Sequence, residues 1–114
     1  MDIKSLFLTG SQEDLLNNHP DAIVIIDLQK TIVFWNRRAQ EIFGYTRREV
    51  IGKDITSVIK GTIENIYRTL GNDQYTILKA YTKIGQEVYV EVTSAENTAR
   101  DEVIISMRNV TKKH

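Results

Sequence analysis

Side chains that could carry out chemistry are few in this 114-residue chain, and they do not gather at recognisable spacings. The absence of cysteine excludes a thiol nucleophile, a thiolate metal site and a disulfide. The two histidines are His19, directly before Pro20, and His114, the last residue, and we interpret both as surface residues. No structured histidine lies near a serine or aspartate at a recognisable spacing, and there is no phosphate-binding loop. The sequence therefore predicts a protein that is not an enzyme.

The charged residues balance, with 15 basic and 15 acidic side chains. The acidic residues at positions 2, 13 and 14 are typical of helix starts rather than of clustered ligands, so no metal site is predicted. Basic residues concentrate in the middle of the chain and include Arg37, Arg38, Arg47 and Arg48. These arginines could meet phosphate, but a neutral chain exerts no long-range attraction on nucleic acid. A solvated helical face is the interpretation we favour.

The overall composition indicates one soluble globular domain. Apolar residues make up 41% of the chain and charged residues 26%, with one proline and six glycines. The length is sufficient for one hydrophobic core but not for two. There is no long apolar run and no pattern of a secretory signal, so we expect a cytoplasmic location without a membrane contact.

The first nineteen residues are expected to form two short helices. Apolar residues recur at helical spacing before and after Gly10, and Pro20 ends the second helix. This segment carries more apolar surface than a short free arm can leave in water, so it should dock on the sheet or on a second copy. We predict a homodimer whose surface contains Ile3, Leu6, Phe7, Leu15 and Leu16.

A hairpin and short helices should follow. The β-branched runs 22–26 and 31–35 predict two strands, and their lack of alternation indicates burial on two faces, at the sheet centre or under a helix. The period becomes helical over 36–43. Thr46 and Glu49 then form a capping box that begins another short helix.

The second half of the chain combines one helical stripe with three strands. Apolar residues between 55 and 70 recur at three- and four-residue steps, and Gly61 divides them into a short turn and a longer helix around Ile63 to Leu70. The period then changes to two, which predicts strands at 74–82, 87–94 and 103–107. The sequence thus predicts an α+β domain.

This order of elements, with a hairpin first and an antiparallel meander last, resembles the PAS family of sensory domains. Five segments resemble the family's motifs in the correct order: Asp21–Asp27, Ile32–Ala39 with Asn36 beginning a helix, Phe43–Tyr45 with Glu49–Lys53, Gly85 with Val90–Val92, and Arg108–Thr111. The resemblance implies a PAS-like five-stranded antiparallel sheet with short helices over one face. The N-terminal helical segment would precede it.

Two positions depart from the family pattern. Lys30 stands where the first hairpin often has glycine, and Asn109 stands where the exit triplet has aspartate. In the family that aspartate can pair with a residue elsewhere in the domain, so an uncharged Asn109 leaves only a hydrogen-bonded form of the link. The resemblance implies that Arg108, Asn109, Val110 and Thr111 are the signal exit.

The resemblance also limits the cofactor. Haem-binding members use a histidine from the helix before the third strand, and the stretch Ile63 to Leu70 contains none. Light-oxygen-voltage domains and photoactive-yellow-type domains need a cysteine, so covalent flavin and cysteine-linked chromophores are excluded. Non-covalent flavin stays open, with Trp35, Asn36, Tyr67 and Tyr75 as candidate contacts, and so does a small metabolite.

A ligand pocket would lie between the predicted long helix and the sheet. A few polar groups among apolar ones could orient a metabolite there. The candidates are Trp35, Asn36, Phe43, Ile63, Ile66, Tyr67, Val90, Val92 and Ser106. The alternative is that these side chains fill the core and leave no cavity, and both interpretations stay open.

We therefore expect a signal-sensing and relay module of a larger regulatory protein. Residues 1–19 would form the helical cap or dimerisation segment, 20–111 the PAS domain, and 112–114 a tail leading to an effector. That effector could be a histidine kinase, a cyclic-dinucleotide enzyme or a transcription regulator. Two alternatives are a small-molecule-binding enzyme on a similar sheet, which needs a pocket lined by titratable groups, and a nucleic-acid binder using the four arginines.

Overall fold

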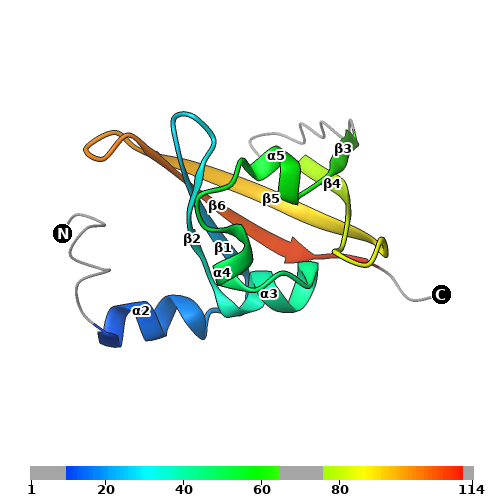
Figure 1. Ribbon diagram of the computed structural model, residues 1–114, viewed down its shortest axis with the longest axis horizontal. Helices are drawn as coiled ribbons and strands as arrows, with labels where there is room; N and C mark the ends of the chain where they lie inside the picture. Colours follow the sequence, from blue (N-terminus) through cyan, green and yellow to red (C-terminus); the bar gives the residue numbers. More distant parts are fainter. Residues whose placement is uncertain (1–9, 65–75, 112–114) are drawn as a thin grey trace, which may run out of the picture.

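A computed structural model describes residues 10–64 and 76–111 of the chain (Figure 1). Four short helices and six strands follow one another in this part. In chain order they are α2 (Gly10–Asn17), β1 (Ala22–Asp27), β2 (Ile32–Trp35), α3 (Arg37–Phe43), α4 (Arg47–Val50), α5 (Ile55–Val58), β3 (Gly61–Glu64), β4 (Thr76–Tyr81), β5 (Glu87–Asn97) and β6 (Glu102–Asn109).

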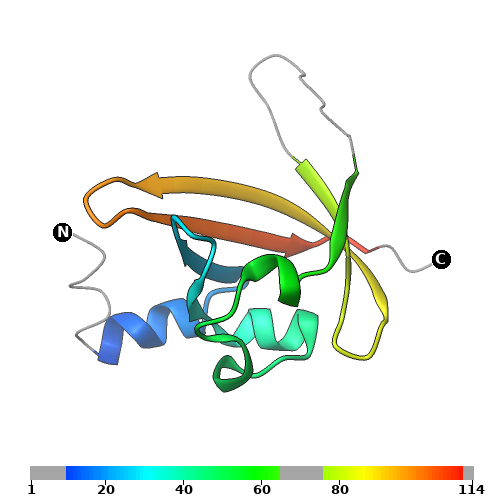
Figure 2. The same cartoon turned by 45° about the horizontal axis from the view of Figure 1, so that its top comes forward.

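The strands form one antiparallel sheet in the order β2-β1-β6-β5-β4-β3. Helices α3, α4 and α5 lie over one face of this sheet (Figure 2). The expected PAS-like sheet with short helices over one face is therefore confirmed, and all five predicted strands are present. The first and last of these strands, β1 and β6, are neighbours in the interior of the sheet.

A sixth strand, β3, corrects the prediction of a longer helix beginning near Ile63. Residues Gly61–Glu64 are extended and pair with β4, with Ile63 opposite Leu78. The apolar residues on both sides of Gly61 share a helical spacing, but pairing with β4 satisfies the backbone of this segment instead. Residues 65–70 of the predicted helix lie outside the described residues.

Strand β1 is buried on both faces, as its unbroken apolar run indicated. Ala22, Val24 and Ile26 face the main core under the helices, while Ile23 and Ile25 join Phe34 in a second cluster on the outer face. Leu16 of α2 packs against that second cluster. Helix α2 thus covers the outer face of the sheet where β1 and β2 pair.

Strand β2 is an edge strand and not a central one. Its Val33 is 40% exposed, where the sequence indicated cover on both faces. A register shift between Ile25 and Ile26 in the pairing with β2 accounts for the exposed side chain, because the shift leaves Val33 without an opposite residue. The other three residues of β2 are buried, and α4 contacts this strand.

The turn between β1 and β2 forces an ordinary residue into a left-handed conformation. Lys30 has φ of 68°. It is held there because its N–H donates to Asp27 O at 3.0 Å and its carbonyl accepts from Ile55 N at 2.9 Å. A left-handed backbone costs a residue with a Cβ about 1–2 kcal/mol, whereas glycine adopts it freely.

Replacing Lys30 by glycine is therefore expected to stabilise the domain. Glycine removes the strain of the left-handed backbone, but it also increases the conformational entropy of the unfolded chain. We expect the net effect of Lys30→Gly to raise the free energy of unfolding by about 1 kcal/mol in urea titrations. Gln29→Gly, at a neighbouring turn position where φ is negative, is the matched control and should lower stability. Equal destabilisation by the two variants would contradict the strain at Lys30.

Candidate functional site

Asn36 lies at the junction of strand β2 and helix α3 and is 1% exposed. Its side-chain oxygen accepts hydrogen bonds from Ile23 N at 2.9 Å and from Ala39 N at 3.0 Å. Its amide nitrogen donates to Leu16 O at 2.7 Å and to Asp21 O at 3.0 Å. All four bonds reach backbone atoms, so this one side chain caps α3 and ties it to α2 and to the start of β1.

Three of the predicted pocket residues, Trp35, Phe43 and Val90, are brought together in the main core. The rings of Trp35 and Phe43 are tilted, with centroids 5.8 Å apart, and the indole N–H donates to Tyr45 O at 3.0 Å. Val92 packs against the same core and is partly buried. These side chains therefore pack against one another beneath the helices.

Ser106 does not join these residues, which corrects its predicted place in the interior. It pairs with Ile23 on one side and Thr93 on the other, so it lies on the outer face, and Met107 occupies the inner one. Its hydroxyl donates to the Asp21 carboxylate at 3.4 Å. The side chain of Ile63, and both Ile66 and Tyr67, lie outside the described residues.

The predicted signal exit is bonded to β5 and to the start of β1. Thr111 Oγ1 accepts from Tyr89 N at 2.8 Å, and Val110 N donates to Tyr89 O at 2.8 Å. The side chain of Asn109 accepts a hydrogen bond from Thr111 N at 2.9 Å. Arg108 Nε lies 3.7 Å from the Asp21 carboxylate.

Asp21 therefore connects the segment that follows α2 with the last strand, β6. Its carboxylate meets Ser106 and Arg108 of the last strand, while its backbone carbonyl accepts from Asn36. Its backbone N–H donates to Nδ1 of His19 at 3.0 Å, in the connection that follows α2. A displacement of the end of α2 thus has a direct route of contacts to the exit strand.

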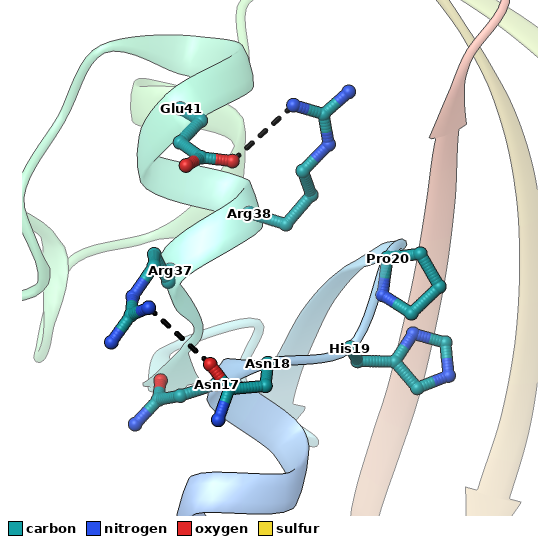
Figure 3. A pocket seen from close by; sticks show the side chains of 7 residues that line it. All are labelled: Asn17, Asn18, His19, Pro20, Arg37, Arg38 and Glu41. Atoms are coloured by element: carbon teal, nitrogen blue, oxygen red, sulfur yellow. Dashed lines mark hydrogen bonds and ion pairs between the residues drawn. The ribbon is translucent and has the colours of Figure 1, made fainter.

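A polar groove opens beside this junction (Figure 3), and we call it the arginine groove. It consists of two hollows of about 420 and 550 Å³ that share Asn17, Arg37 and Glu41. The remaining lining residues are Asn18, His19, Pro20 and Arg38 in the first hollow and Trp35, Asn36, Gln40 and Arg47 in the second. Three of the four arginines noted in the sequence lie here.

Sequence reasoning missed the asparagines of this groove. Arg47 donates from NH2 to Asn17 Oδ1 at 3.1 Å, and Arg37 donates from NH1 to Asn18 Oδ1 at 3.3 Å. The two pairs connect the end of α2 with α4 and with α3. A run of two asparagines before His-Pro is an ordinary turn signal, and nothing local in it points to arginine partners.

The described titratable groups with shifted pKa values lie outside the arginine groove. A hydrogen bond from Lys83 is the main cause that lowers the pKa of Glu49 to about 2. The Thr56 hydroxyl lowers the pKa of Asp54, and Glu87 raises the pKa of Lys79. Each shift follows from a helix cap or a surface ion pair.

Comparison with known protein families identifies the family of this chain. The family model described as a PAS domain matches residues 20–112. The chain belongs to the PAS family. A search of curated proteins gave no match.

Similar solved structures agree on the PAS fold. The PAS domain of nitrogen regulation protein NR(II) from Vibrio parahaemolyticus is 18% identical, with a TM-score of 0.65 over 90% of this chain and 100% of the other. The PAS domain of an HTR-like protein from Haloarcula marismortui is 22% identical, with a TM-score of 0.62 over 95% and 97%. A LOV protein from Rhodobacter sphaeroides is 14% identical, with a TM-score of 0.73 over 97% and 70%.

Residues 10–64 and 76–111 contain neither a membrane-spanning helix nor a cluster of metal-ligating side chains. No helix in these ranges is long and apolar enough to cross a membrane. The same residues contain no group of three or more His, Cys, Asp or Glu side chains placed to hold a metal ion.

Removing the Asn36 side chain is expected to weaken the whole junction. We expect Asn36→Ala to lower the free energy of unfolding by about 3 kcal/mol, because it leaves buried backbone groups without partners and removes the cap of α3. Asn36→Asp retains the acceptor but places a carboxylate against two carbonyl oxygens, and should also destabilise. Exposed Asn18→Ala is the control and should change stability by less than about 0.5 kcal/mol in the same urea titrations.

Proposed function

We propose that this PAS domain is a signal-sensing and relay module of a larger regulatory protein and does not itself catalyse a reaction. The observation that carries the proposal is Asp21, which contacts Arg108 and Ser106 of the exit strand while its backbone is bonded to Asn36 and His19. Signal modules need such a link between the element that changes and the element that leaves the domain. The pKa shifts described above arise at caps and ion pairs, which supports a role other than catalysis.

Among the possible effectors we favour a histidine kinase over a cyclic-dinucleotide enzyme or a transcription regulator. One similar structure is a PAS domain from a two-component sensor histidine kinase, at 12% identity and a TM-score of 0.66. Another is the LOV domain of a blue-light activated histidine kinase from Erythrobacter litoralis, at 13% identity and a TM-score of 0.64. As the signal we propose a colourless small metabolite or a protein contact, since the chain has no cysteine for a covalent chromophore.

The relay is tested through Asp21. In a chimera that carries this chain in place of the PAS domain of a histidine kinase, we expect Asp21→Asn to change autophosphorylation severalfold, because it removes the charge that holds Arg108. Glu96→Gln, which neutralises an exposed carboxylate of β5, should leave the output unchanged. Native output from both variants would contradict the proposed route, provided that both chimeras fold.

We further propose a homodimer through the N-terminal segment. Leu15 is 71% exposed on α2, next to Leu16, which packs on the sheet. The other predicted dimer residues, Ile3, Leu6 and Phe7, lie outside the described residues. An exposed leucine beside a docked one supports a helix that presents one apolar face to its own sheet and another to a partner.

A charge at Leu15 should dissociate this dimer. We expect Leu15→Glu to give a monomer in light scattering, because a carboxylate would be buried without a partner. Ile84→Glu is the matched control, since Ile84 is 86% exposed on the turn between β4 and β5. A dimer that survives both Leu15→Glu and deletion of residues 1–18 would overturn this surface.

A further inference from the structure

The arginine groove combines one fixed guanidinium with two that are loosely held. Arg47 donates from Nε to Trp35 O at 3.0 Å and from NH2 to Asn17, and its guanidinium carbon lies 5.0 Å from the centroid of the Phe34 ring. These contacts make Arg47 part of the wall. Arg37 is exposed and has a long 3.3 Å bond to Asn18, while Arg38 is paired with Glu41 at 3.3 Å.

Arg37 and Arg38 can leave their present partners at a small cost in free energy. The Arg38 and Glu41 side chains are 39% and 55% exposed, and an ion pair one helical turn apart at such exposure contributes little to stability. A guanidinium carries five N–H donors, and Arg37 directs one of them to Asn18. Both cations can therefore turn toward a ligand without loss of a buried contact.

The charges and donors of the groove favour an anion. Three arginines and one carboxylate line the two hollows, so the positive charges of the lining exceed the negative ones and favour an anion. The amide of Asn18 keeps its nitrogen as a donor, since its oxygen accepts from Arg37. Because Nδ1 of His19 accepts from Asp21 N, the neutral ring carries its proton on Nε2 and is a donor there.

The shape of the groove favours a compact anion over a polymer. Arg37 and Arg38 line one hollow from the start of α3, and Asn18, His19 and Pro20 line it from the end of α2 and the connection to β1. In Figure 3 the Arg37 guanidinium points to Asn18, while the Arg38 guanidinium points to Glu41. Arg48, the fourth arginine of the sequence cluster, is exposed on α4 and lines neither hollow. A nucleic-acid backbone needs a basic stripe along its length, and here Arg37 and Arg38 line one hollow instead.

We propose that the arginine groove binds a small anion with two or more negative charges, of the kind found in a phosphate group or a dicarboxylate. Arg37 and Arg38 form charged hydrogen bonds to its oxygens, and Asn18 and His19 add neutral donors from the end of α2. The anion bridges α3 and the α2–β1 connection. This binding site stands apart from the proposed relay function and does not require it.

Binding is tested by ¹H–¹⁵N NMR titration of the full chain at constant ionic strength with inorganic phosphate, pyrophosphate, succinate and citrate in separate arms. We expect saturable shifts at Asn18 and at the Arg37 side chain with at least one anion, and the arms distinguish phosphate from carboxylate chemistry. Arg37→Gln and Arg38→Gln should each weaken binding about tenfold. Arg48→Gln, the matched control, should leave the affinity within about twofold.

Two results would overturn the site. Shifts that do not saturate, or that Arg48→Gln reduces as strongly as Arg37→Gln, would show a diffuse charge effect. A single-stranded RNA that binds more tightly than every small anion and depends equally on Arg48 would show an extended nucleic-acid face. The variants replace exposed or half-buried side chains, and the dispersion of their NMR spectra confirms that they fold.

Discussion

The hydrogen bonds of Asn36 are the constraint on which the arrangement of the domain depends. One buried amide satisfies four backbone groups from three elements, and it can do so only when the end of α2, the start of β1 and the start of α3 converge. Chain connectivity then places Trp35 in the core on one side of Asn36 and Arg37 in the groove on the other. The interior and the polar surface site are therefore positioned by the same residue.

Features that depend on local order could be predicted from the sequence. The capping box of Thr46 and Glu49 is present, and Asn36 caps α3, because a cap is decided within a few residues. The period of two that predicts β5 agrees with its burial, because Val88 and Val90 lie in the main core and Val92 packs against it. Lys30 stands where the first hairpin of the family often has glycine, and its φ of 68° shows that this turn requires a left-handed backbone.

Features that depend on distant partners could not be predicted in this way. Strand β3 forms because Gly61–Glu64 finds β4, and the same residues also fit a helical stripe. Ser106 was assigned to the wrong face because one step of register against β1 exchanges the faces of β6. The groove joins Asn17 to Arg47, and no local pattern connects two residues so far apart.

The position of β1 between β2 and β6 also has a consequence for the order of folding. Among the six strands of the described sheet, β1 is synthesised before the others and its neighbour β6 after them. Until β6 has left the ribosome, a strand buried on both faces in the native domain has one edge and much of its apolar surface uncovered. The domain therefore closes late, through contacts of high sequence separation, and a chain that stops before β6 presents an aggregation-prone edge.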